Sequence, residues 1–313
     1  MKTGIFLSYI GLGSNLLHLS YCHEIAKKHG PISIVTICKN LEQVLEDDPL
    51  IKEVIFLDSY HKKFVDIFKL SKFFRSKNFD NFYIFYPSIR FLLASKIAGI
   101  KNIYTYRLFK KKNLHMVKAA QEFTKKNLDL SNCPTETNIY ISQKKLDFAK
   151  KEIDENKKNI IIGAGSSGPS TRWGEVNYIN LINKLNTEDD FIFYILCGPD
   201  QNDIANKIIN SVNKKNCVSL SKKKIRELVP LISLCNLYIG NDSFGHHVTS
   251  QCGIPSIILM LDTPRAYSDY SVNQYRITPS EIDINNITHD SKINPDMIKL
   301  DQVYQKTLSL IKK

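Results

Sequence analysis

Short apolar runs alternate with longer amphipathic stretches along most of the chain, and this alternation limits the possible fold more than any other feature. The apolar runs lie at 4–8, 32–37, 54–58, 82–86, 102–106, 159–163, 191–197, 217–220, 237–241 and 256–260. Helices are expected near 15–29, 40–47, 62–77, 88–98, 113–128, 142–155, 175–186, 201–213, 224–233, 244–252 and 295–311. Nearly continuous apolar strands between amphipathic helices are typical of parallel sheets with helices on both faces. The sequence therefore predicts an α/β fold of the doubly wound type.

The alternation is interrupted once, and the interruption divides the chain. Residues 107–156 are polar and rich in lysine, and the strand–helix rhythm starts again at 159. Two Rossmann-like halves, 1–150 and 151–313, are the simplest architecture, with the last helix able to pack back on the first half. Ligands of such folds lie beyond the carboxyl ends of the strands, so we expect the site in loops that follow strands, at a cleft between the halves.

Basic residues are concentrated in one segment of the first half. The chain has a net charge of +12, and the segment from Lys62 to Lys126 alone holds 16 Lys or Arg against three acids. A solvated, lysine-rich surface is one interpretation of this segment. Attraction to an anionic glycolipid, a glycan or a phospholipid surface is the other. No nucleic-acid motif accompanies the segment, so nucleic acid is not expected as a partner.

The cysteines and the hydropathy pattern indicate a cellular compartment. The seven cysteines are scattered singly without CxxC spacing. This pattern argues against a disulfide framework and against a zinc site, and it favours a reducing cytosol. No run reaches the roughly 18 apolar residues that a membrane span requires. We therefore expect a cytoplasmic protein whose membrane contact, if any, is peripheral.

A polar, glycine-rich loop follows the first strand of the second half. Its letters, GAGSSGPSTRWGE at 163–175, fit GxGxxG, but Pro169 follows the third glycine and the next helix is expected only near Gly174. This context argues against a dinucleotide fingerprint. The alternatives are a flexible loop and a diphosphate site, in which N–H groups, hydroxyls and a guanidinium bind the oxygens. The candidate groups are Gly165, Ser166, Ser167, Thr171 and Arg172, whereas Trp173 is expected in the core.

The most specific stretch is GNDSFGHHVTSQCGIPSI at 240–257. A strand is expected to end at Asn241, and a helix to begin after Asp242 and Ser243, either of which could cap it. Free N–H groups at a helix start favour a phosphate, while capping and packing are the alternative roles. His246 and His247 are adjacent on the helix and therefore point about 100° apart, so they are not expected to share a metal ion.

Two further strand ends carry candidate polar groups. In CGPDQND at 197–203, Asp200 and Asp203 could accept hydrogen bonds from ribose hydroxyls, or Asp200 could cap a helix. The stretch FLSYIGLGSNLLHLS at 6–20 runs from a strand through a glycine turn into a helix. Gly11 and Gly13 would let the backbone approach a ligand there. Leu16 stands where a dinucleotide fingerprint would carry its third glycine.

These loops, taken in order, resemble those of the family 9 glycosyltransferases, the heptosyltransferase-like enzymes of bacterial lipopolysaccharide assembly. Residues 171–175, TRWGE, are similar to the family's K-[RH]-W-P-E loop. Residues 242–248, DSFGHHV, with GIP at 253–255, are similar to its signature D-[ST]-G-x-x-H-L-A and the G-x-P that follows. Residues 12–14, LGS, are similar to part of its S-x-L-G-D opening.

The resemblance implies two Rossmann-like domains in the GT-B arrangement, the first binding an acceptor and the second a donor. It implies inverting, metal-independent transfer of a sugar without a cofactor. The donor would be a nucleotide-diphosphate sugar of the ADP-heptose type, and the acceptor an anionic glycolipid or glycan precursor at the inner membrane. The residues implied to contact the donor are Arg172, Asp242, Ser243, Phe244, Gly245 and His246, with His247 orienting the loop.

The sequence departs from the family pattern at three positions. Ser14 stands where the family carries the aspartate regarded as its general base, Thr171 replaces a lysine, and Phe244 replaces the first glycine of the signature. A serine cannot remove an acceptor proton without a partner base. The catalytic candidates of this loop are Ser14, Asn15 and His18, and Asp242 or His246 are alternative bases from the second half. A non-catalytic nucleotide-sugar-binding relative and a nucleotide-sugar epimerase are the alternative functions.

Overall fold

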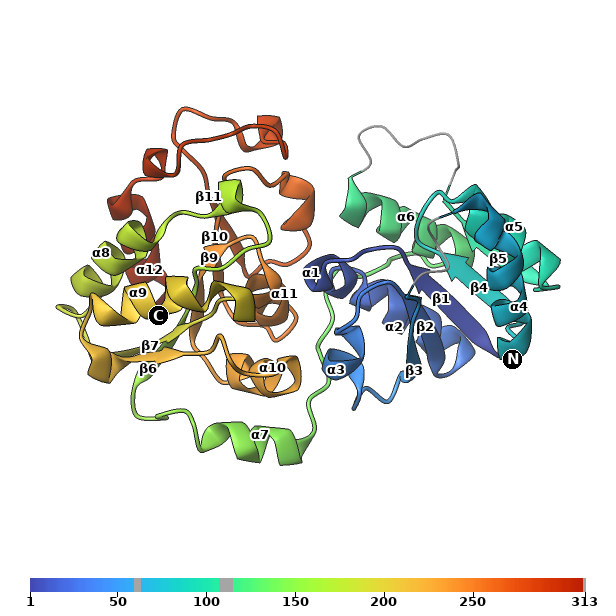
Figure 1. Ribbon diagram of the computed structural model, residues 1–313, viewed down its shortest axis with the longest axis horizontal. Helices are drawn as coiled ribbons and strands as arrows, with labels where there is room; N and C mark the ends of the chain where they lie inside the picture. The colour runs from blue at the N-terminus through green and yellow to red at the C-terminus, as the bar shows by residue number, and fades with distance from the viewer. Residues whose placement is uncertain (59–62, 107–114, 312–313) are drawn as a thin grey trace. The chain divides into compact units, whose positions relative to one another are not determined.

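The computed structural model describes residues 1–58, 63–106 and 115–311, which form two compact α/β units, Met1–Tyr140 and Ile141–Lys313 (Figure 1). The expected boundary at 150/151 would place α7 (Gln143–Lys150) in the first unit. In the structure α7 packs on α10 (Ile225–Ser233) and belongs to the second unit.

The first unit is built on a sheet of five parallel strands in the order β3-β2-β1-β4-β5. The strands are β1 (Thr3–Leu7), β2 (Ile32–Thr36), β3 (Ile51–Phe56), β4 (Asn81–Ile84) and β5 (Asn102–Thr105). The strand order reverses between the neighbours β1 and β4. Loops leave such neighbours in opposite directions, and ligands of doubly wound sheets bind at the carboxyl ends of the strands at such a reversal.

Helices cover both faces of the first sheet. They are α1 (Leu12–Leu16), α2 (Leu19–His29), α3 (Leu41–Leu45), α4 (Ile67–Lys77), α5 (Ile89–Ile97) and α6 (Met116–Leu128). Successive side chains of β4 point to opposite faces of the sheet, and each set packs against a different layer of helices. Phe82 and Ile84 pack with α4 and α5 in one core cluster, while the Tyr83 ring contacts Phe123 of α6.

The second unit contains six parallel strands in the order β11-β10-β9-β6-β7-β8. The strands are β6 (Lys158–Gly163), β7 (Phe191–Ile195), β8 (Cys217–Ser219), β9 (Leu237–Asn241), β10 (Ser256–Leu259) and β11 (Gln274–Ile277). The sequence did not predict β11. Its residues QYRI include two strongly polar side chains, and three of the four are only half-buried, so no apolar run marks this edge strand.

The helices of the second unit also pack in two groups. Besides α7 and α10 they are α8 (Glu175–Leu185), α9 (Asn202–Asn210), α11 (Phe244–Ser250) and α12 (Leu300–Ile311). The C-terminal helix α12 packs on α8 and on β9 and β10 of its own unit, while α11 packs on β6, β9, β10 and α10. Trp173 is fully buried in the core, as expected, and its indole N–H donates to the Ile298 carbonyl at 3.1 Å.

Every apolar run coincides with a strand, so the predicted fold class is confirmed. The N-terminal glycine turn is shorter than predicted, because residues 12–16 already form α1. The helix expected near 15–29 is present as the end of α1 and as α2, which begins at Leu19. Gly11 caps α1 in an extended backbone conformation, with φ −70° and ψ 134°, and Gly13 lies inside that helix. All seven cysteines are unpaired. No helix among the described residues is long and apolar enough to cross a membrane.

Candidate functional site

Loops from the carboxyl ends of β6 and β9 meet where the strand order of the second sheet reverses. Ligands of doubly wound sheets bind at such a reversal. Two glycines let the strands end in close contact, because a Cβ on Gly240 would lie 2.6 Å from the Gly163 Cα and from its carbonyl oxygen. The polar groups that follow these two strands therefore form the candidate site.

Asn241, the last residue of β9, joins the loops by hydrogen bonds. Its Oδ1 accepts from the Trp173 backbone N–H and from the Tyr178 hydroxyl, both at 2.9 Å, and its Nδ2 donates to the Ala164 carbonyl at 2.9 Å. The residue is fully buried. From the sequence, Asn241 was expected only to end a strand. An amide at the end of an otherwise apolar strand is the one signal that could have revealed this role.

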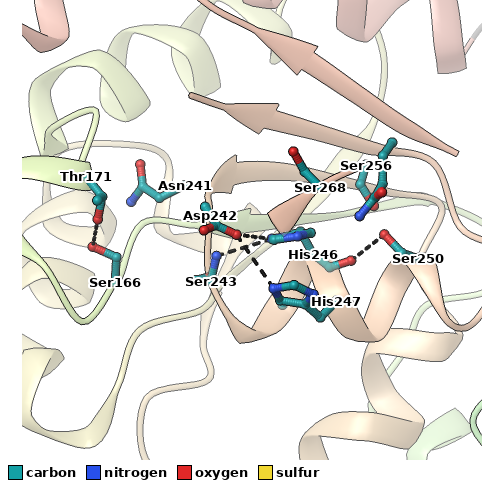
Figure 2. A network of polar contacts seen from close by, with 12 residues as sticks. Ser166, Thr171, Asn241, Asp242, Ser243, His246, His247, Ser250, Ser256 and Ser268 are labelled. Carbon is teal, nitrogen blue, oxygen red and sulfur yellow. Dashed lines mark hydrogen bonds and ion pairs between the residues drawn. The ribbon is translucent and has the colours of Figure 1, made fainter. Parts of the chain in front are cut away.

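Asp242 follows directly and faces both histidines of α11 (Figure 2). Its Oδ1 lies 3.1 Å from His246 Nδ1 and 3.6 Å from His247 Nε2. The two imidazole rings lie 3.8 Å apart between centroids. The expectation that the adjacent histidines diverge was therefore wrong, because their side chains turn toward the same carboxyl group.

Burial decides the charge of this cluster. Desolvation raises the pKa of Asp242 to about 7, although a hydrogen bond with Thr263 acts in the opposite direction. Desolvation also lowers the pKa of His246 to about 3 and holds the pKa of His247 well below its usual value. Both rings are therefore neutral near pH 7, and the Tyr270 hydroxyl lies 2.9 Å from His247 Nδ1.

Asp242, His246 and His247 also have the residue types of a metal site, since one ligand atom of each lies within 4.8 Å of the others. One nitrogen of each ring has a hydrogen-bond partner, whereas His246 Nε2 is buried and has none among the described residues. The Ser243 N–H donates to His246 Nδ1 at 3.2 Å, and His247 Nδ1 pairs with Tyr270. Independence of a metal remains a prediction for this site.

The N–H groups at the start of α11 are the expected phosphate site, and one of them is already bonded. Ser243 caps the helix, but its N–H is bonded to His246 and is not available to a phosphate. Gly245 is explained by packing, because a Cβ there would lie 2.5 Å from the Tyr238 ring. Phe244 is half-buried. Contact of these three residues with a donor remains a prediction.

The loop after β6 is held in shape by its own polar groups. The Thr171 hydroxyl donates to Ser166 Oγ at 2.7 Å. Arg172 Nη2 and Gln201 Nε2 both donate to the Ser166 carbonyl, at 3.0 and 2.8 Å. Arg172 Nε and Gln201 Oε1 are buried and have no hydrogen-bond partner among the described residues. The loop thus offers an unused guanidinium N–H and an unused acceptor beside the reversal point.

Gln201 is a residue that sequence reasoning missed. Asp200 and Asp203 on either side of it are exposed, as is Ser167 of the neighbouring loop. Gln201 instead reaches across to Ser166, and Gly165 makes room for it, since a Cβ there would lie 2.6 Å from Gln201 Oε1. Asp200 and Asp203 were predicted instead because carboxylates accept hydrogen bonds from ribose hydroxyls. Nothing in the local sequence indicates that Gln201 contacts Ser166 in the loop after β6.

In the first unit, Asn15 holds α1 on the sheet. Its Nδ2 donates to the carbonyls of Tyr9 and Gly11 at 2.9 and 2.7 Å, and its Oδ1 accepts from the Thr36 hydroxyl at 3.0 Å. These bonds occupy the whole amide and give Asn15 a structural role. Ser14, on the same helix, is half-buried. A catalytic role for either residue remains a prediction.

His18 lies in the core and not at the surface. Its Nδ1 is 2.7 Å from the Ser14 carbonyl, which can only accept, so Nδ1 carries the proton. Its ring stacks on Tyr9 at 4.7 Å and is fully buried, and burial lowers the pKa of His18 to about 4. Its Nε2 has no partner among the described residues. The lone pair on His18 Nε2 is therefore free of a hydrogen bond among the described residues, but it lies in the core of the first unit.

Comparisons with known proteins extend this picture. The model of "Glycosyltransferase family 9 (heptosyltransferase)" matches residues 89–282. A glycosyl transferase family 9 structure from Veillonella parvula DSM 2008 is 19% identical with a TM-score of 0.79, covering 99% of this chain and 97% of that chain. The E. coli ADP-heptose lps heptosyltransferase II is 16% identical with a TM-score of 0.71, covering 98% and 99%. A search of the curated proteins finds no match.

A third solved structure, E. coli heptosyltransferase WaaC with ADP, is 14% identical with a TM-score of 0.71 and covers 99% of both chains. At sequence identities this low, structural similarity shows a shared fold and does not show a shared reaction. The predicted fold, two Rossmann-like units of the GT-B type, is confirmed by these similarities.

Proposed function

Because the chain belongs to glycosyltransferase family 9, we propose that it transfers a heptose-like sugar from a nucleotide-diphosphate donor of the ADP-heptose type. The proposed acceptor is a lipopolysaccharide or another bacterial surface-glycan precursor. We place the reaction in the cytoplasm, at the inner membrane surface. Support for the donor type comes from E. coli WaaC, which has been solved with ADP and with ADP-2-deoxy-2-fluoro heptose.

The observation that carries this proposal is the unused Arg172 Nε beside the strand reversal. A guanidinium can bind diphosphate oxygens through parallel N–H groups, and hydroxyls can complete the cradle. The Trp173–Asn241 hydrogen bond joins the residue after Arg172 to the residue before Asp242. Arg172 and Asp242 are therefore the chain neighbours of the hydrogen-bonded residues Trp173 and Asn241. In this arrangement Arg172 would bind the diphosphate and Asp242 would bind the sugar.

The proposed reaction is an in-line displacement. An acceptor oxygen bonds to the anomeric carbon, the bond from that carbon to the diphosphate breaks, and the hydroxyl proton passes to a base. Arg172 would stabilise the charge that develops on the leaving diphosphate, so no metal is required for that task. A serine hydroxyl at position 14 is too weak a base to act alone. His18 Nε2 is buried in the core of the first unit, so the Asp242 carboxylate is the remaining candidate base.

A turnover assay tests the proposal. The protein is incubated with ADP-heptose, with and without a lipopolysaccharide-precursor extract, and ADP release is measured in the presence and absence of EDTA. We expect release that needs the acceptor and is insensitive to EDTA. Ser14→Asp restores the carboxylate of the family pattern and should raise the rate by roughly 10²–10⁴-fold, while Ser14→Ala should not.

Other outcomes of this assay point elsewhere. Loss of activity in EDTA that is restored by a divalent cation would contradict metal independence and would draw attention to Asp242, His246 and His247. Conversion of the donor sugar without any acceptor would favour an epimerase. Donor binding without turnover in wild type and in Ser14→Asp would favour a non-catalytic nucleotide-sugar-binding protein, the second candidate that Ser14 suggests.

A further inference from the structure

Helix α4 of the first unit has an outer face that its own packing does not explain. Its inner side chains Ile67, Leu70 and Phe74 are buried in the core between α4 and the sheet. Phe68, on the same helix, is 71% exposed, and Val65, in the turn directly before it, is also 71% exposed. Two large apolar side chains are thus exposed to solvent at an i, i+3 spacing, which places residues on one face of a helix.

The same face is strongly basic. Lys63, Lys69, Lys72 and Arg75 are all exposed. Asp66, the acid within 63–79, is buried, and its Oδ2 accepts a hydrogen bond from the Lys63 N–H at 2.8 Å. No exposed acid within 63–79 therefore offsets the four cations. The basic segment predicted from the sequence, 62–126, extends beyond this face. Five of its basic residues lie outside the described residues, namely Lys62, Arg107, Lys110, Lys111 and Lys112.

We propose that this α4 face docks on a bilayer that contains anionic phospholipid. Phe68 and Val65 enter the headgroup layer, and the four cations bind lipid phosphates around them, which is how basic amphipathic surfaces attach to membranes. Charge complementarity selects this occupant. A second copy would bring the same cations against each other, and a nucleic-acid backbone offers nothing to the two apolar side chains. The proposal rests on the first unit and is independent of the proposed sugar transfer.

Co-sedimentation of the full chain with vesicles tests the proposal. The vesicles consist of phosphatidylcholine alone or of phosphatidylcholine mixed with phosphatidylglycerol. We expect binding to the mixed vesicles that falls as salt is added. Each basic residue near an anionic surface contributes about 1 kcal/mol, so Lys69→Glu with Lys72→Glu should lower the partition coefficient about thirtyfold or more. Phe68→Ser should lower it roughly tenfold.

Two matched controls lie in the second unit. Lys214→Glu with Lys215→Glu makes the same change in net charge at exposed positions, and Phe148→Ser removes a phenylalanine that is 60% exposed on α7. Both controls should bind vesicles like wild type. All variants alter exposed side chains, and their ADP-sugar binding, measured without vesicles, should equal that of wild type. That measurement separates a failure here from a failure of the proposed function.

A tryptophan placed in the face gives a second readout. The Phe68→Trp variant should shift its emission to the blue when anionic vesicles are added, against the constant signal of the buried Trp173. Absence of binding to the mixed vesicles would overturn the proposal. Equal losses in the α4 and control variants, or sedimentation of the Phe68→Trp variant without a change in its emission, would also overturn it. A dimer that Phe68→Ser dissociates would assign the face to a second copy instead.

Discussion

At the scale of single residues, Asp242 links the candidate site to the pH dependence of stability. Its pKa is 3.8 in the unfolded reference and about 7 in the folded protein, because burial disfavours the carboxylate. Between these values the folded state holds a proton that the unfolded chain has released. The contribution of Asp242 is therefore fully present below about pH 4 and is lost as pH rises through about 7.

Asp242→Asn should remove this dependence. The free energy of unfolding of the variant, relative to wild type, should increase as pH rises from about 4 to about 7, by at most about 4 kcal/mol. Urea denaturation at several pH values measures the difference, and Asp203→Asn, at an exposed position, is the control. A wild-type-to-variant difference that does not change with pH would show that Asp242 is not a buried, protonated carboxyl.

Substitutions of the adjacent residues Asn15 and Ser14 should affect stability differently, because Asn15 has a structural role and Ser14 does not. Asn15→Ala breaks two hydrogen bonds that tie α1 to Tyr9, after β1, and to Thr36 of β2, and a third to the helix cap Gly11, so it should lower the free energy of unfolding by about 2–3 kcal/mol. Ser14→Ala should change it by less than about 0.5 kcal/mol. Thermal or urea unfolding of both variants gives the comparison. Equal effects of the two substitutions would contradict the structural role assigned to Asn15.

At the scale of secondary-structure elements, the close contact of β6 and β9 is a requirement of the site. Gly240→Ala would push a Cβ to 2.6 Å from the Gly163 backbone, and it should destabilise the protein by about 1–3 kcal/mol or more. Gly11→Ala is the matched control, because its Cβ would meet nothing closer than Ser14 Oγ at 3.8 Å. Unfolding curves of the two variants decide the matter, and a Gly240→Ala protein as stable as wild type would refute the contact.

Most strands were predictable from the sequence, whereas β11 and the start of α1 were not. Apolar runs such as 159–163 and 191–197 predicted their strands because a buried parallel strand needs apolar side chains on both faces. β11 lacks that signal because it is a half-buried edge strand. The start of α1 at Leu12 was not predicted, because Asn15 holds this helix through Tyr9 and Thr36, contacts that are made only when β1 and β2 are paired.

The candidate site was predictable in its location and less so in its contacts. The loops after β6 and β9 were expected because ligands bind at the carboxyl ends of parallel strands. The joint approach of His246 and His247 to Asp242 depends on side-chain torsions, which the angular spacing of residues on a helix does not describe. Gln201 could not be chosen over Asp200, because its contact with Ser166 depends on how two loops pack.

At the scale of the whole molecule, each unit carries its own strand reversal, and the second unit supplies the proposed donor groups by itself. Arg172, Gln201 and Asp242 all follow strands of one sheet. Donor binding should therefore be measurable without an acceptor. We propose that a nucleotide-diphosphate sugar binds at these loops through Arg172.

Calorimetric titration of ADP-heptose into wild type, Arg172→Ala and Arg226→Ala measures this binding. Arg226 is an exposed arginine elsewhere in the same unit. Hydrogen bonds to charged groups contribute about 1.5–3 kcal/mol, so Arg172→Ala should weaken binding roughly 10- to 150-fold, while Arg226→Ala binds like wild type. Fluorescence of Trp173, the single tryptophan and the neighbour of Arg172, can follow the same titration. Equal affinity of wild type and Arg172→Ala, or no binding of ADP-heptose to wild type, would contradict the account.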